Sequence, residues 1–200
     1  MSIDAVILVV VVLLVGVPLL TFVHELGHAL VAVFAVGGRV TVIQGPDPAR
    51  ARFSVGRLDF RMHGLPLPHQ TWIGWAHWDE SARPRRQALA LAGGPAASLL
   101  SAAACFTGAL ASGGTARFIL FVLAGDAAAQ LTSTSLPVRY PAFSGQYAGH
   151  ASDGFQVRQL LTVGVPHPDP ALPAPMLRDH AATSEPAARV AAPAPPAARS

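Results

Sequence analysis

An apolar run that covers residues 5–36 constrains the fold of this chain more than any other feature of its sequence. As one helix the run would measure about 48 Å, which exceeds the roughly 30 Å of a bilayer's hydrocarbon core. The only charged residue before the HELGH motif at 24–28 is Asp4, so the N-terminus lacks the basic region of a signal peptide. We therefore interpret the run as a retained membrane span.

The composition of the chain points in the same direction. Hydrophobic residues make up 52% of the chain and charged residues only 12%, against roughly 25% charged residues in a typical soluble domain. The net charge of +3 is small and no basic stripe alternates with aromatic residues, so we expect no nucleic-acid partner. The single cysteine, Cys105, excludes an internal disulfide and a cysteine-based zinc site. Any metal site must therefore use His, Asp or Glu.

Two further apolar stretches, 87–111 and 116–136, complete a predicted core of three membrane spans. Between the first and second spans, residues 39–62 show the alternating pattern of strands, with a slip at Gly56 that indicates a bulge. A short final helix is predicted at 153–164. The predicted fold class is a mainly α membrane protein, with a three-span transmembrane helical core and a small cytoplasmic-side β-hairpin.

The membrane-embedded domain is predicted to cover residues 1–165 and to be followed by a disordered tail at 166–200. The tail holds nine of the chain's 18 prolines, together with many alanines. Such a segment cannot bury enough apolar surface to offset the conformational entropy that it would lose on ordering.

The distribution of arginine predicts the orientation of the spans. The loop 37–86 carries eight of the chain's 14 basic residues, whereas on the opposite side, where the second span ends and the third begins, Arg117 is the one arginine. By the positive-inside rule this loop is cytoplasmic, which places the HELGH motif nearer the cytoplasmic side of a multi-pass cell-membrane protein. Lysine is absent while alanine and proline are abundant, which is typical of a GC-rich bacterial genome and indicates a bacterial plasma membrane.

The HELGH motif is the feature that carries chemistry. Residues four apart face the same side of a helix, so His24 and His28 can bind one Zn²⁺. Glu25 stands beside the first ligand, where its carboxylate can take a proton from the attacking water as a general base. The motif predicts a zinc endopeptidase that hydrolyses peptide bonds and holds one zinc ion per chain.

An alternative is that the motif matches by chance and that its histidines only pack inside the protein. The position of the motif argues against this, because each ionisable group at membrane depth costs roughly 2.5–3.5 kcal/mol on the insertion scale. Two imidazoles and a carboxylate within five residues call for a compensating ion. We therefore favour a catalytic zinc site.

A catalytic zinc takes three protein ligands and a water molecule, so the motif leaves one ligand to be found. Two aspartates are candidates, Asp126 within the third span and Asp153 at the start of the last helix. An aspartate within a span is a functional candidate by default, although Asp126 could also form a hydrogen bond between helices. The residue pattern alone leaves both open. We interpret the histidines of the cytoplasmic loop as surface residues: His63, His69 and His77.

Three sequence elements occur in an order that is known from one family of proteases. They are the membrane-embedded HELGH, a Gly-Pro-x-x-small segment at 94–98, and a Leu-Pro pair at 136–137 followed by the Asp-Gly pair at 153–154. Over about residues 5–164 the chain resembles the site-2 protease family of intramembrane zinc metalloproteases. The resemblance implies Asp153 as the third zinc ligand and, as partners, the lipid bilayer and transmembrane protein substrates. It also implies that the strand region could pair with an unwound substrate as an added strand.

The sequence departs from this family at three points. Ser98 and Thr134 stand where the family often has asparagine, and the resemblance implies that both take part in substrate binding. The gap from Pro137 to Asp153 is longer than usual. The alternative function is a non-catalytic membrane scaffold or regulator, which would have no need of Glu25. A soluble zinc protease with an N-terminal anchor is disfavoured by the two later apolar stretches.

Overall fold

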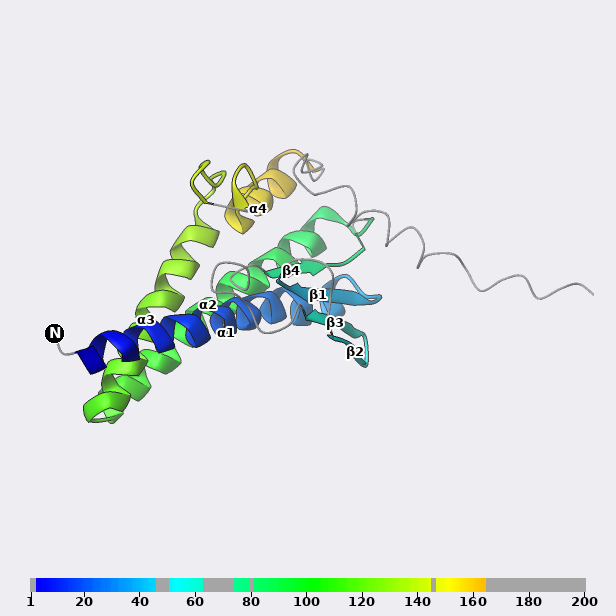
Figure 1. Ribbon diagram of the computed structural model, residues 1–200. Coiled ribbons are helices and arrows are strands. Elements are labelled where there is room, and N and C mark those ends of the chain that lie inside the picture. Colours follow the sequence, from blue (N-terminus) through cyan, green and yellow to red (C-terminus); the bar gives the residue numbers. More distant parts are fainter. Residues whose placement is uncertain (1–2, 46–50, 63–73, 80, 145–146, 165–200) are drawn as a thin grey trace, which may run out of the picture. The chain divides into compact units, whose positions relative to one another are not determined.

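A computed structural model describes residues 3–45, 51–62, 74–79, 81–144 and 147–164 of the chain. Within this part the chain is mostly helical, with a small mixed sheet (Figure 1). The helices are α1 (Ile3–Ala35), α2 (Pro84–Ala111), α3 (Gly114–Ser135) and α4 (Asp153–Thr162). The strands are β1 (Val40–Gln44), β2 (Ala51–Val55), β3 (Leu58–Met62) and β4 (Gly74–His77). The predicted tail at 166–200 lies outside the described residues.

Helices α1, α2 and α3 are each long and apolar enough to cross a membrane. They occupy the predicted spans, and their ends differ from the predicted ends by at most three residues. Large apolar side chains remain exposed along all three helices, among them Val15 at 65%, Leu100 at 70% and Phe118 at 42%. Such exposure is compatible with a lipid environment, because in water it would leave extended apolar surface uncovered.

Helices α1 and α2 approach each other closely where the HELGH motif lies. A Cβ atom built on Gly27 of α1 or on Gly93 of α2 would lie within 2.5 Å of the other glycine's carbonyl oxygen. Ala29, Ala32 and Ala90 are completely buried in the same region. Small residues let two helix backbones come into contact, which is how helices associate within a membrane. The motif is therefore held tightly against α2.

The sheet has the strand order β2-β3-β1-β4, with β1 parallel to β3 and antiparallel to β4. Val40 and Val42 of the central strand β1 are completely buried, in one cluster with Ala32 of α1. At the end of β1, Gln44 Nε2 donates a hydrogen bond of 2.7 Å to the carbonyl oxygen of Pro18. These contacts attach the sheet to α1 beside the motif.

The predicted β-hairpin with a bulge at Gly56 is wrong in detail. Gly56 lies in a tight turn with a φ of 60°, and the strands on either side of it, β2 and β3, pair antiparallel from Val55 and Leu58 outward. A bulge and a two-residue turn produce the same slip in an alternating pattern, so only the pairing distinguishes them. The fourth strand, β4, is missing from the prediction because four residues are too few to show alternation.

Candidate metal centre

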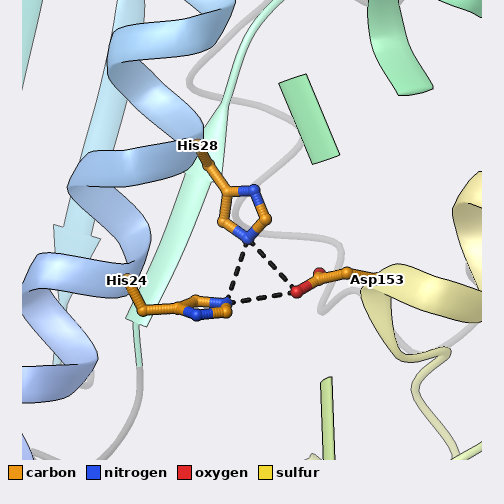
Figure 2. Close-up of side chains that lie close together, drawn as sticks. All are labelled: His24, His28 and Asp153. Atoms are coloured by element: carbon orange, nitrogen blue, oxygen red, sulfur yellow. Dashed lines mark hydrogen bonds and ion pairs between the residues drawn. The ribbon is translucent and has the colours of Figure 1, made fainter. Parts of the chain in front are cut away.

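Two histidines of α1 and one aspartate of α4 bring their side-chain atoms together (Figure 2). The Nε2 atoms of His24 and His28 lie 3.1 Å apart. Asp153 Oδ2 lies 3.1 Å from the first of these atoms and 3.3 Å from the second. The histidines are 3% and 4% exposed. These three residues could hold a metal ion.

The triangle formed by the three ligand atoms has the size that a tetrahedral zinc site requires. Zinc binds histidine nitrogen at about 2.0–2.1 Å, so neighbouring ligand atoms around a tetrahedral ion lie about 3.3–3.4 Å apart. The observed separations of 3.1–3.3 Å are close to this value. Three protein ligands would leave a fourth position for water or substrate, which is the arrangement of catalytic zinc.

The second ring nitrogen of His28 shows how this ligand is oriented. His28 Nδ1 lies 3.0 Å from the carbonyl oxygen of Ala90, which can only accept, so Nδ1 donates to it in the tautomer that carries the ring proton there. The backbone N–H of Gly94, 3.2 Å from the same Nδ1, is the donor in the other tautomer. In the first tautomer, His28 Nε2 directs a lone pair toward the centre. Metal-binding histidines commonly donate their other N–H to a carbonyl group in this way.

Asp153 contributes an anionic oxygen to the centre. Burial raises the pKa of its carboxyl group, but His28 and then His24 lower it by more, so that the pKa lies well below its usual range. The carboxylate also lies in the first turn of α4, where the helix dipole favours a negative charge. The group is thus ready to bind a cation without losing a proton first.

The loop between α3 and α4 returns on itself and thereby places Asp153 beside α1. At its base, the backbone nitrogen of Tyr140 donates to the carbonyl of His150 at 2.9 Å, and that of Ser152 donates to Val138 at 3.0 Å. These bonds bring the end of the loop back to its beginning. The unusually long segment before Asp153 is therefore a loop whose two ends are bonded together, and its length does not move the aspartate away from the histidines.

The residues on either side of Asp153 determine its local position. Ser152 caps α4, because its Oγ accepts a hydrogen bond of 3.2 Å from the backbone nitrogen of Phe155. A Cβ atom on Gly154 would lie 1.9 Å from the carbonyl oxygen of Ser135. The glycine of the Asp-Gly pair therefore lets the start of α4 pack directly on the end of α3.

Glu25 lies beside the ligand residues and under the start of β4. It is 8% exposed and interacts electrostatically with His28, His24 and Asp153. Gly74 packs on its side chain, since a Cβ atom there would lie 2.4 Å from Glu25 Cγ. The backbone N–H of Ala76 donates a hydrogen bond to the carboxylate. The start of β4 therefore orients the predicted general base.

Tyr147, from the loop before α4, holds β4 in this position. Its hydroxyl accepts a hydrogen bond of 3.0 Å from the backbone nitrogen of Gly74, and its ring centre lies 5.4 Å from that of Trp75. Burial, and next the charge of Glu25, raise the pKa of Tyr147, so the hydroxyl stays neutral. No local sequence pattern indicates Tyr147, because its partner Gly74 is 73 positions away.

The structure brings one of the two candidate aspartates to the histidines. Asp153 belongs to the group that could hold a metal ion, whereas Asp126 lies on α3, half-buried and outside that group. Of the three loop histidines, His77 lies in β4, and His63 and His69 lie outside the described residues.

The two residues assigned to substrate binding by resemblance have different surroundings. Ser98 is 2% exposed, and its Oγ lies 2.8 Å from His24 Nδ1. Thr134 lies near the end of α3, where its hydroxyl donates to the carbonyl of Gln130 at 2.9 Å. Ser98 is thus directly behind a ligand residue, and Thr134 makes a hydrogen bond within its own helix.

Gly94 is a further residue that the centre requires, and replacing it by alanine is expected to abolish high-affinity metal binding. A Cβ atom there would lie 2.2 Å from His28 Nε2 and 2.6 Å from His24 Nε2, in the space of the ligand atoms. The measurement is the Zn²⁺ dissociation constant of Gly94→Ala in detergent. Gly125→Ala is the control, because a Cβ atom at Gly125 meets nothing within 4 Å. Equal affinity in the two variants would contradict this role.

Comparisons with known proteins add no family assignment to this geometry. No family model matches the chain, and no curated protein matches it significantly. The functional argument therefore depends on the residues and contacts of the chain itself.

Proposed function

We propose that this chain is an intramembrane zinc metalloendopeptidase that hydrolyses peptide bonds of membrane-spanning proteins. One observation supports this most strongly. His24, His28 and Asp153 bring three ligand atoms within 3.3 Å of one another, and the histidines belong to a helix that is long and apolar enough to span a membrane. Glu25 is buried beside them. The arrangement agrees with the resemblance to the site-2 protease family.

The proposed reaction divides the work between the ligands and the base. The two histidines and Asp153 would hold Zn²⁺, which polarises the scissile carbonyl and lowers the pKa of the attacking water to about 7. Glu25 accepts a proton from that water as it attacks, and then delivers the proton to the leaving nitrogen. The peptide C–N bond breaks, and a carboxylic acid and an amine are released. Contacts with Gly74 and Ala76 hold Glu25 in place, which reduces the entropic cost of each proton transfer.

In this proposal an extended substrate segment binds beside β4, the edge strand that contacts Glu25. β1 and β3 are internal strands of the described sheet, so two edges remain, those of β2 and β4. Only β4 is seen to contact the general base, through Gly74 and Ala76. A substrate segment beside β4 would lie with its backbone next to Glu25. The resemblance predicted that the substrate would pair with strands within residues 39–62, and β4 lies outside that range.

The proposed location is the plasma membrane of a bacterium, with the centre nearer the cytoplasmic side. Cysteine labelling tests the orientation, in a Cys105→Ser background that removes the only native cysteine. In intact cells, an impermeant maleimide is expected to label Thr115→Cys, in the first turn of α3. It is expected to label Arg57→Cys, in the turn between β2 and β3, only after permeabilisation. The reverse pattern would contradict the orientation.

Metal removal tests the proposed activity itself. Purified protein in proteoliposomes is expected to contain about one zinc per chain and to cleave a helical membrane substrate. Treatment with a strong chelator is expected to abolish cleavage, and added Zn²⁺ to restore it, because the three ligands alone supply no Lewis acid. Zinc content is measured by elemental analysis and cleavage by product mass. Full activity after the metal has been removed would refute the proposal.

A further inference from the structure

Helix α3 supplies none of the three ligand atoms, yet it reaches the centre through Gln130. Gln130 Oε1 accepts a hydrogen bond of 3.1 Å from Ser98 Oγ. Ser98 Oγ in turn lies 2.8 Å from His24 Nδ1. Ser98 is 2% exposed, so bulk water does not compete for these bonds. The contacts run from α3 through α2 to the first ligand residue on α1.

The proton positions in this series follow from the chemistry of the serine hydroxyl, which has one proton to donate. The amide oxygen of Gln130 can only accept, so Ser98 gives its proton to Gln130. Ser98 Oγ must then act as acceptor toward His24, and the ring proton of His24 lies on Nδ1. His24 Nε2 is left with a lone pair that faces Asp153 and His28.

We propose that Ser98 and Gln130 are positioning residues that hold His24 in the tautomer able to bind a metal. Without Gln130, the Ser98 hydroxyl could rotate and donate its proton to His24 Nδ1. The ring proton would then move to Nε2, where it blocks coordination. This inference rests on the metal site of the proposed function. It also replaces the substrate-binding role expected for Ser98, because the contacts of its hydroxyl are with His24 and Gln130.

The test compares Zn²⁺ affinities of full-length variants in detergent, measured by competition with a chromophoric chelator. Ser98→Ala and Gln130→Leu are each expected to weaken binding about 10–100-fold, the usual effect of removing an outer partner of a metal-bound histidine. Ser98→Thr keeps the hydroxyl and is expected to retain most of the affinity. The matched controls are Ser101→Ala on α2 and Thr132→Val on α3, which are expected to bind as the wild type does.

Two further measurements distinguish positioning from a general loss of structure. The double variant Ser98→Ala/Gln130→Leu is expected to bind Zn²⁺ no more weakly than Ser98→Ala alone, since Gln130 acts only through Ser98. Co²⁺ in place of Zn²⁺ reports the ligand geometry by its visible absorption, which is expected to change in both single variants. A change in stability alone would leave that spectrum as in the wild type.

The outcomes separate this inference from the proposed function. Wild-type affinity in both single variants, or fully additive losses in the double variant, would overturn the positioning role and leave the proposed protease standing. A wild-type protein that binds no Zn²⁺ would overturn the proposed function and this inference with it. Thermal melting of the metal-free proteins checks folding. If Ser98→Ala fails to fold, Gln130→Leu decides, because its side chain is one step further from the ligand.

Discussion

Substitution of Glu25 by glutamine is expected to abolish detectable peptide cleavage while zinc binding remains. Glutamine keeps the size and the hydrogen-bonding capacity of the side chain, but it cannot accept a proton from water at neutral pH. Loss of a general base typically costs about 10²–10⁴-fold in rate. The three ligand atoms come from other residues, so the Zn²⁺ content is expected to stay at the wild-type level. Cleavage of a helical substrate in proteoliposomes and elemental analysis are measured on the same sample.

A matched control for Glu25→Gln converts a different carboxylate, one on the sheet, to the corresponding amide. Asp59 of β3 pairs with Arg39 at 3.3 Å on the exposed side of the sheet, and Asp59→Asn is expected to leave cleavage unchanged. Such a surface ion pair contributes little to stability. If Glu25→Gln cleaved as the wild type does, Glu25 would not be the base. A function in cells that survives Glu25→Gln would favour the non-catalytic scaffold.

Replacement of Asp153 by alanine is expected to remove zinc from the protein, whereas Asp126→Ala is expected to retain it. Asp153 Oδ2 lies 3.1 and 3.3 Å from the two histidine nitrogens, and Asp126 is outside this group. Loss of an outer-shell partner weakens metal binding by roughly 10–100-fold, and loss of a direct ligand should weaken it by at least as much. Zinc content after gel filtration, and the dissociation constant from chelator competition, provide the measurement.

The paired design makes the Asp153 experiment decisive, because both variants remove one carboxylate from a helix of the same domain. Zinc retained in Asp153→Ala would rule out this residue as a ligand. Zinc lost only in Asp126→Ala would assign the third ligand to α3, against the geometry of the centre. Folding of each variant is checked by thermal melting in the metal-free state, so that loss of the metal is not confused with loss of the fold.

Sequence patterns of short range predicted the helices and part of the site. The three spans follow from runs of apolar residues, and their observed ends lie within three residues of the predicted ones. The pairing of His24 with His28 follows from helical periodicity, since residues four apart face the same side. The same reasoning misread Gly56 as a bulge, because an alternating pattern does not record which strands pair.

The choice between Asp126 and Asp153 depended on contacts between distant parts of the chain. His24 and Asp153 are 129 positions apart, and the closed loop before α4 brings them together. Residue type favoured neither aspartate, because both lie near apolar segments and both could bind a metal. The resemblance pointed to Asp153, and the hydrogen bonds at the base of the loop explain why a longer gap still delivers it.

The sequence alone therefore determined the apolar helices, the two imidazoles on one helix face and the carboxylate next to them. All of these features are set by residues within a few helical turns of one another. Only the tertiary structure decided which aspartate meets the histidines, that β4 and Tyr147 cover Glu25, and that Gln130 reaches His24 through Ser98. Periodicity specifies which face of an element is apolar, but the partner of a polar side chain depends on how the elements pack.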